Sequence, residues 1–459
     1  METIEQEETK QVNNKKEMLF TTKDILKLFI PLIIEQFLEF LVGLADSVMV
    51  AFVGENAVSG VSIVDFIMSL LISIFGALAT GGAVIIGQYL GKKQKEKGKE
   101  VANQLVWFSL AVGTIIMIII YLIKPLILNV LYSSITDEVR KEANIYFMIV
   151  TASIPFISLY SAGAALFRTM GNSKLPMKVM FAMNIINFVG DLILIVGLGY
   201  GTAANGITTL IARVGAGLIV IGLLFDPKRE LYIEKTIKHK FDWQIIRKIL
   251  RIGVPYGLEN GLFYLGRIFV LTIVSMFGTA AIAGNSVGGS IVSFQNLPGL
   301  AIGMGLTVII AKCVGAGDYK QARYYTKKVM GMVYVAHFIC SAIILLIMPL
   351  ILKIYNLSPE ANQYVNQIAW LHAIFVVTFW IPAYTLPVVF RASGDAKFPM
   401  IVGTISMFLC RIVLAYIISV NLGFGMMGTW YAMCIDWIIK AIIFTFRYIN
   451  GKWTRYQVV

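Results

Sequence analysis

Charged side chains are scarce in this chain of 459 residues. Asp, Glu, Lys and Arg together make up 14% of it, whereas an ordinary soluble domain carries about 25%. Hydrophobic residues make up 58%. So few charges cannot cover the surface of soluble domains of this total size, and the composition therefore predicts an all-α membrane protein.

Residues and motifs that serve catalysis or cofactor binding are also scarce. No phosphate-cradling GxxxxGK loop is present, which argues against ATP hydrolysis, and no His/Asp cluster with an interfacial motif suggests a membrane acyltransferase. We therefore predict a protein that is not an enzyme and holds no cofactor. The cysteines show no ligand-like spacing, so packing is favoured over metal or disulfide roles. They are Cys313, Cys340, Cys410 and Cys434.

Long apolar runs account for most of the chain. About 20 apolar residues cross a bilayer core as a helix, and twelve such runs can be placed. They lie near 25–52, 58–86, 102–123, 143–167, 176–198, 204–225, 247–276, 282–311, 328–352, 362–390, 398–420 and 426–449. We expect a cytoplasmic N-terminal arm (1–21), a first lobe (22–225), a cytoplasmic linker (226–246), a second lobe (247–450) and a cytoplasmic tail (451–459).

The positive charges give an orientation. If the N-terminus is cytoplasmic, the loops on the other side carry only Lys124, Arg140, Lys141 and Lys353. Lys and Arg favour the cytoplasmic side of membrane proteins, so both termini are predicted to be cytoplasmic. The arm, residues 1–17, is polar and is expected to be disordered, and no signal-peptide cleavage site follows it.

The two halves are internal repeats. At a shift of 224 residues Glu35 aligns with Glu259 and Gly91 with Gly315, and at a shift of 223 FRTMGNSKLPM (167–177) aligns with FRASGDAKFPM (390–400) with six identities. Because each half has six helices, both halves enter the membrane in the same direction. We therefore predict two six-helix bundles related by a pseudo-twofold along the membrane normal, with a cavity between them.

Ionisable residues inside spans are the candidate functional residues, because each costs about 2.5–3.5 kcal/mol at a helix centre. Asn184, Asn187 and Asp191 are three and four residues apart, on one helix face. With Asp46 and Thr209 they supply oxygens that can share a proton or bind sodium. The other ionisable residues noted within spans are Glu35, Asp65, Arg213, Glu259, Arg267, Arg411, Asp436 and Lys440.

Structural explanations compete with functional ones at several of these positions. Amides often join membrane helices, and this is the favoured interpretation of Asn184. The repeated acids Glu35 and Glu259 favour a symmetric structural role, with a secondary polar or substrate role as the alternative. Asp46, Asn187 and Asp191 align instead with non-acidic residues in the second half, which assigns the coupling site to the first lobe. These residues are Val270, Cys410 and Leu414.

The helix motif LADSVMVAFVG, the doubled loop motif and the NxxxD of Asn187 and Asp191 resemble the multidrug and toxic compound extrusion (MATE) family, specifically its DinF-like branch. The resemblance covers about residues 22–450. It implies that Asp46, Asn187, Asp191 and Thr209 form a proton- or cation-coupling site. If the protein binds a sodium ion, we expect the ion at these four residues and no other metal elsewhere. Pro31 is a candidate hinge of the first helix.

The same resemblance implies a monomeric multidrug antiporter in the bacterial cytoplasmic membrane. Its partners would be bulky, often cationic organic compounds and the lipid bilayer, without nucleic acid, and inward flow of protons or sodium would drive export. The residues leave both ions open. The alternative function is a flippase for a lipid-linked precursor, which would need a cationic groove for phosphate.

Overall fold

The computed structural model describes residues 18–128, 135–234, 240–456 and 458–459; the predicted disordered arm, 1–17, lies outside this part. The first half contains α2 (Thr22–Ala51), α3 (Glu55–Gly91), α4 (Lys95–Leu126), α5 (Asp137–Thr151), α6 (Ile154–Thr169), α7 (Lys174–Asp191), η2 (Leu192–Gly197) and α8 (Gly201–Leu224). The second half contains α9 (Trp243–Ser275), α10 (Thr279–Gly315), α11 (Tyr319–Tyr355), α12 (Pro359–Phe375), η3 (Val376–Trp380), α13 (Ile381–Ser393), α14 (Lys397–Ser406), η4 (Met407–Leu414), η5 (Ile417–Asn421), α15 (Met427–Ile449) and η6 (Lys452–Arg455).

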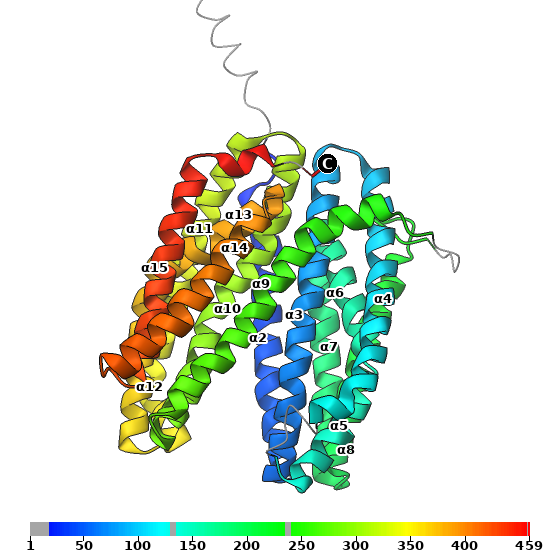
Figure 1. The fold of residues 1–459 in the computed structure, drawn as a ribbon. Helices are drawn as coiled ribbons and strands as arrows, with labels where there is room; N and C mark the ends of the chain where they lie inside the picture. The colour runs from blue at the N-terminus through cyan, green and yellow to red at the C-terminus, as the bar shows by residue number, and fades with distance from the viewer. Residues whose placement is uncertain (1–17, 129–134, 235–239, 457) are drawn as a thin grey trace, which may run out of the picture.

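These helices assemble into two bundles that stand side by side, as Figure 1 shows. In the described part of the chain, ten helices are long and apolar enough to span a membrane, and the pair α5 and α6, bent by 49°, provides another. The 23-residue α15, which carries Asp436 and Lys440, is not among these spans but follows them as a further long helix. With it each bundle has six spanning units, as predicted. We call the bundle of α2–α8 the N-lobe and that of α9–α15 the C-lobe.

The lobes pack against each other through glycines related by the repeat. A Cβ atom added to Gly91 would lie 2.1 Å from the carbonyl oxygen of Lys312, and one added to Gly315 would lie 2.0 Å from that of Gln88. Gln88 and Lys312 are themselves 224 residues apart, so each lobe makes the same contact with the other. This reciprocal contact is the signature of a twofold axis. It supports the pseudo-twofold predicted from the sequence.

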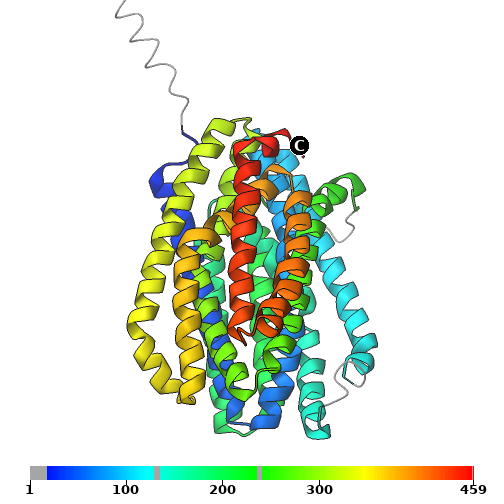
Figure 2. The same cartoon turned by 60° about the vertical axis from the view of Figure 1, so that its left-hand side comes forward.

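The glycine contacts lie at the end of the molecule where the described chain begins and ends. Phe20, at the start of α2, donates its backbone N–H to the Tyr325 hydroxyl of α11 over 2.8 Å. Lys92, just after α3, donates to the carbonyl oxygen of Val459 over 2.7 Å. Figure 2 shows both ends of the described part of the chain on this side after a 60° turn. The lobes are therefore closed against each other at this end.

Aromatic pairs join the lobes farther along the helices. The rings of Phe37 and Phe40 on α2 meet Phe294 of α10 at 4.9 and 5.6 Å between centroids. The ring of Phe66 on α3 meets Tyr264 of α9 at 6.0 Å. Such pairs contribute beyond their buried area. They mark the level at which α2 meets α10 and α3 meets α9 across the interface between the lobes.

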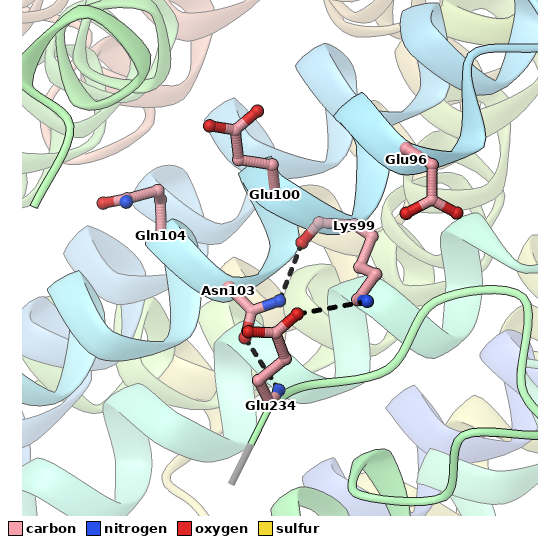
Figure 3. A pocket seen from close by; sticks show the side chains of 6 residues that line it. All are labelled: Glu96, Lys99, Glu100, Asn103, Gln104 and Glu234. Carbon is pink, nitrogen blue, oxygen red and sulfur yellow. Dashed lines mark hydrogen bonds and ion pairs between the residues drawn. The ribbon is translucent and has the colours of Figure 1, made fainter. Parts of the chain in front are cut away.

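The segment that joins the lobes is fixed on α4. Figure 3 shows a charged hollow between them. There the Asn103 side chain accepts from the backbone N–H of Glu234 over 2.9 Å, and Lys99 pairs with the Glu234 carboxylate at 3.1 Å. The α9 helix then begins at Trp243, four residues earlier than the predicted boundary at 247, because Asp242 caps its first backbone N–H groups.

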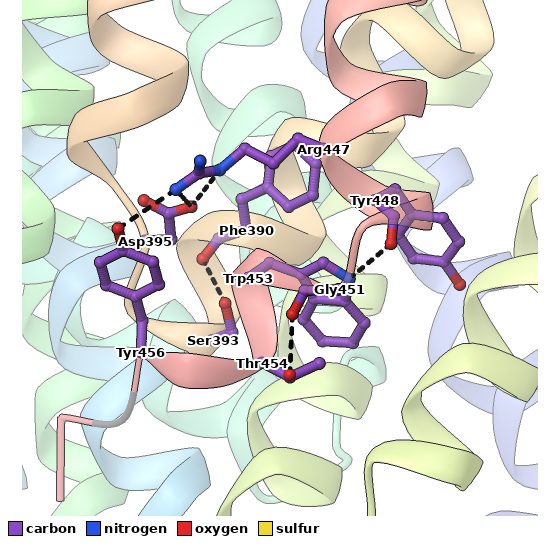
Figure 4. Close-up of polar contacts among 9 residues, drawn as sticks. All are labelled: Phe390, Ser393, Asp395, Arg447, Tyr448, Gly451, Trp453, Thr454 and Tyr456. Carbon is purple, nitrogen blue, oxygen red and sulfur yellow. Dashed lines mark hydrogen bonds and ion pairs between the residues drawn. The ribbon is translucent and has the colours of Figure 1, made fainter.

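The C-terminal segment folds back onto the C-lobe. Trp453 is fully buried, donates to the carbonyl oxygen of Tyr448 over 3.2 Å and stacks on the Tyr448 ring. Nearby, Arg447 pairs with Asp395 of the repeated loop at 2.6 Å, as seen in Figure 4. The described residues 451–456 of the predicted tail thus pack as part of the C-lobe at this end.

The glycine contact gives a first prediction. Gly315→Ala places a methyl group against the Gln88 backbone, so we expect it to lower stability by about 2 kcal/mol, seen as a lower unfolding temperature of the purified protein. Gly289→Ala on the same helix is the control, because its new Cβ meets nothing within 4 Å. Equal unfolding temperatures for the two variants would contradict the close contact between lobes.

Candidate functional site

The N-lobe holds a buried carboxylate among polar side chains. Asp191, the last residue of α7, is fully buried. It accepts hydrogen bonds from the Thr208 hydroxyl and, over 3.2 Å, from the Asn205 amide, both on α8. The chain continues directly from Asp191 into the π-helical turn η2, a distortion often found at functional sites. Two helices thus converge on this single acid.

Asn187 and Thr209 lie in the same cluster. Asn187, one turn before Asp191, is buried and donates to the hydroxyls of Thr208 and Thr209, each over 3.4 Å. The structure therefore brings together the Asn187, Asp191 and Thr209 that the sequence singled out. Thr209 reaches the cluster through Asn187, whereas its neighbour Thr208 contacts the carboxylate directly.

Asp46 completes the cluster from α2. Its carboxyl group is half-buried and lies within side-chain hydrogen-bonding range of Asp191. Two ionised carboxylates repel each other at this range, and a single proton between them turns the contact into a hydrogen bond. A cation among their oxygens would relieve the same repulsion. The arrangement is therefore suited to hold one positive charge.

One arginine provides positive charge close to this cluster. Arg213 of α8 lies within electrostatic range of Asp46 and of Asp65 on α3, and it donates to the Ser153 hydroxyl over 3.4 Å. Asp65 also accepts a 2.9 Å hydrogen bond from the Tyr146 hydroxyl of α5. Arg213 forms no ion pair within 4.0 Å in the described part of the chain. Its positive charge therefore partly balances the negative charges of Asp46 and Asp65 without a direct ion pair to either carboxylate.

Sequence reasoning missed Asn205 and Thr208. Both lie in the stretch AANGITTL at the start of α8, where residues three apart share a helix face, so Thr208 could have been grouped with Asn205. Among the described residues the side-chain oxygen of Asn205 has no hydrogen-bond partner. A buried amide oxygen without a partner is suited to bind a hard cation such as sodium.

The repeated acids form repeated ion pairs. Glu35 of α2 is buried and pairs with Arg168 of α6 at 2.6 Å, while Glu259 of α9 pairs with Arg391 of α13 at 3.1 Å. Both arginines come from the doubled loop motif. These contacts support the symmetric structural role favoured for Glu35 and Glu259, and they bind the first helix of each lobe to its fourth spanning unit.

Two other singled-out residues lie apart from the hydrogen-bonded cluster. The Asn184 amide nitrogen is buried and has no hydrogen-bond partner among the described residues, so it donates no hydrogen bond to Asn187. Pro31 is buried within α2, which continues through it. Because proline has no backbone N–H, the carbonyl four residues earlier lacks its helical hydrogen-bond donor, and a helix bends most easily at such a turn.

The C-lobe has no acid at the positions equivalent to Asp46 and Asp191, but it has another buried acid, Asp436. Asp436 of α15 is fully buried and pairs with Lys440 at 3.0 Å and Arg411 at 3.3 Å, and it also accepts from the Ser406 hydroxyl. Lys440, four residues after Asp436 on the same helix, therefore supplies a counter-charge to it. This acid has two fixed cations, whereas Asp191 has none within ion-pair distance among the described residues.

The buried histidines belong to another C-lobe cluster. Both histidines contact Gln295 of α10. The Nδ1 atom of His372 lies 2.5 Å from the side-chain oxygen of Gln295, and the Nδ1 atom of His337 lies 3.0 Å from its backbone oxygen. Their rings meet Trp437 and Trp380 edge to face. These contacts pack both rings within the C-lobe. The four cysteines are also buried and unpaired.

Comparison with known families gives a match in both halves of the chain. The family profile MatE matches residues 31–193 and again 255–417. The two matched segments begin at Pro31 and Pro255, which the repeat aligns. The internal duplication inferred from the sequence is therefore confirmed by two copies of one family domain.

Relatives and solved structures cover nearly the whole chain. The uncharacterized transporter YisQ of Bacillus subtilis is 27% identical, with 94% of this chain and 95% of YisQ covered. A probable multidrug resistance protein NorM of Thermotoga maritima is 22% identical, with 97% and 96% covered. A crystal structure of MATE in a straight conformation has a TM-score of 0.85 at 20% identity, with 94% and 96% covered. These matches confirm the predicted fold.

The contrast between the two buried acids generates a second prediction. Asp436→Asn leaves two buried cations without their counter-charge, so we expect a loss of about 3 kcal/mol or more in stability and poor recovery of folded protein. Asp46→Asn breaks no ion pair and should retain near-normal thermal stability. Adding Lys440→Met to Asp436→Asn should recover part of the loss. Normal stability of Asp436→Asn would refute this ion-pair role.

Proposed function

Because the chain belongs to the MatE family of multidrug and toxic compound extrusion transporters, we propose that it is a secondary active antiporter that exports bulky organic compounds in exchange for protons or sodium ions. The buried Asp191, in contact with Asp46 and without a fixed counter-cation, is the observation that carries this proposal. The relatives named as probable multidrug resistance proteins support the substrate class.

The coupling site comprises Asp46, Asn187, Asp191 and Thr209, extended by Asn205 and Thr208. A proton or sodium ion entering it removes the repulsion between the two carboxyl groups and draws α2 towards α7 and α8. An empty site relaxes in the opposite direction. Since α2 also packs against the C-lobe through Phe29 and Gly305, a change in its position alters the contact between lobes.

The orientation proposed from the positive charges makes the closed end of the molecule cytoplasmic. In that orientation the described conformation is closed towards the cytoplasm. Bending of α2 near Pro31, which lies close to this end, would alter the glycine contacts between the lobes. Alternating access then requires the lobes to separate at this end and to approach each other at the other, as in other transporters with two parallel repeats.

The described arginines give no support to lipid-phosphate transport. Arg411 is paired with Asp436, Arg213 lies within the N-lobe beside Asp46 and Asp65, and Arg267 lies on α9 of the other lobe. A cationic groove would need several arginines side by side on one surface. We therefore favour drug export over flipping of a lipid-linked precursor.

The coupling acids give a third prediction, tested with inside-out membrane vesicles. A proton gradient alone, or a sodium gradient alone, with the ion concentrated in the lumen should drive accumulation of a fluorescent organic cation. Asp46→Asn and Asp191→Asn should each abolish this accumulation, because neither variant can hold and release the coupling ion at this site. The double variant should be little worse than either single one, since each breaks the same cycle.

Asp137→Asn, an exposed acid at the start of α5, is the matched control and should transport normally. Thr208→Val should impair coupling more than Thr209→Val, because only Thr208 contacts the carboxylate. The gradient that drives the wild-type protein identifies the ion. Normal accumulation by Asp191→Asn under both gradients would rule out Asp191 as the coupling acid.

The orientation gives a fourth prediction. In a variant lacking the four buried cysteines, a single cysteine at Lys95 should react with an impermeant maleimide only from the cytoplasmic side. One at Glu138 should react only from the outside. Both positions are exposed, so access to reagent is limited by the membrane alone. Reaction of both from the same side would disprove the twelve-span arrangement.

A further inference from the structure

The segment after α15 touches both lobes at the closed end of the molecule. Gly451, which has a left-handed φ of 65°, turns the chain back after α15. The described residues that follow are 452–456 and 458–459, and we call them, with Gly451, the C-terminal segment. Its first part packs on the C-lobe, and its last residue contacts the N-lobe.

Trp453 anchors the C-terminal segment on the C-lobe. Its fully buried ring stacks on Tyr448 of α15 at 5.6 Å between centroids and meets Tyr319 of α11 edge to face at 6.0 Å. Tyr456 adds a second contact, because its hydroxyl accepts from Arg447 of α15 over 3.2 Å. Figure 4 shows these aromatic rings and Arg447 side by side. A buried indole whose N–H is hydrogen-bonded makes a firm attachment.

The last two residues lie where the C-lobe meets the N-lobe. Val458 packs on the repeated loop, since a Cβ atom added to Gly394 would lie 2.5 Å from its side chain. Val459 accepts a 2.7 Å hydrogen bond from the ammonium of Lys92, the residue that caps the end of α3. One turn earlier on α3, Gln88 donates to a carbonyl oxygen of the same loop over 3.0 Å. The segment therefore crosses the line along which α3 meets the repeated loop.

The repeat gives this segment a counterpart in the linker. A shift of 224 residues aligns Trp453 with Arg229. Arg229 also folds back on the last helix of its lobe, where it donates to the carbonyl oxygen of Leu223 over 2.7 Å and lies over the Phe167 ring at 5.1 Å. The linker then continues covalently into the C-lobe. The C-terminal segment instead reaches the N-lobe through noncovalent contacts, which can break and form again.

The contact of Lys92 with Val459 depends on the positions of the two lobes. Its donor belongs to the N-lobe, and its acceptor follows the anchor on the C-lobe, so separation of the lobes at this end would break it. A hydrogen bond from a charged donor contributes more than one between neutral groups. An interaction present in only one of two conformations shifts the equilibrium towards that conformation.

We propose that the C-terminal segment is a clasp that stabilises the conformation closed at this end and so limits how often the lobes separate there. Trp453 holds the clasp on the C-lobe, and Lys92 receives it on the N-lobe. This inference rests on the alternating access of the proposed function. It concerns the regulation of that movement, and it is independent of which ion or compound is transported.

The test measures how often the closed contact opens. Ala311 of α10 is fully buried, and a Cβ atom added to Gly87 of α3 would lie 2.7 Å from its methyl carbon, so this methyl group faces the other lobe. The parent protein for the test lacks the four native cysteines and carries Ala311→Cys. In lipid nanodiscs, without an ion gradient or drug, the rate of its labelling by N-ethylmaleimide follows the population of the open form when opening and closing are fast.

Two changes release the clasp in different ways. Lys92→Met removes the donor, and a chain shortened by Val458 and Val459 removes the acceptor and the packing on the loop. Each should raise the labelling rate about tenfold, as expected for the loss of one hydrogen bond from a charged donor. Lys92 is exposed, and the shortened chain keeps Trp453, so size-exclusion profiles should stay normal.

Lys93→Met is the matched control. It removes the same charge from the next residue, which is exposed and forms no ion pair within 4.0 Å among the described residues, and it should label at the parent rate. The clasp is overturned if Lys92→Met or the shortened chain labels within twofold of the parent, or if Lys93→Met is accelerated as much as Lys92→Met. The measurement needs no gradient, so a failure of coupling at Asp191 in the vesicle assay is a separate result.

Discussion

The charge balance inside the bilayer is the constraint on which this structure depends. An ionised group far from water needs a counter-charge or strong hydrogen bonds. Glu35, Glu259 and Asp436 each have a fixed cation within 3.5 Å. Asp191 has only neutral donors and a second carboxyl group beside it. Among the described residues the paired acids thus have a fixed counter-charge, whereas Asp191 has none, and this is why the proposed mechanism assigns the uptake of a proton or cation to Asp191.

The duplicated chain makes this distinction visible. Its structural elements are retained in both halves: the Glu–Arg pairs, the reciprocal glycine contacts and the loop after the fourth spanning unit. Its asymmetric elements differ between the halves: Asp46 and Asp191 lack acidic counterparts at Val270 and Leu414. The retained pairs hold each lobe together, whereas the divergent positions are the reason for proposing that cations couple in one lobe.

Much of the fold could be predicted from the sequence, because spans depend on the length of apolar runs and the repeat is a direct alignment. Part of the site depends on helix rotation. Successive residues point about 100° apart on a helix, so the choice between Thr208 and Thr209 as the partner of Asp191 needed the structure.

The same charge balance indicates where a bound cation exerts its effect. Loading of the N-lobe site changes the forces between α2, α7 and α8, while the C-lobe ion pairs are unaffected by it. The α2 helix carries Glu35 and Asp46, and so connects the structural ion pair of Glu35 with Arg168 to the proposed coupling site. Because α2 also packs on α10 at Gly305, a shift of α2 would change the interface between the lobes. In the proposed mechanism this contact links cation binding to exposure of the substrate.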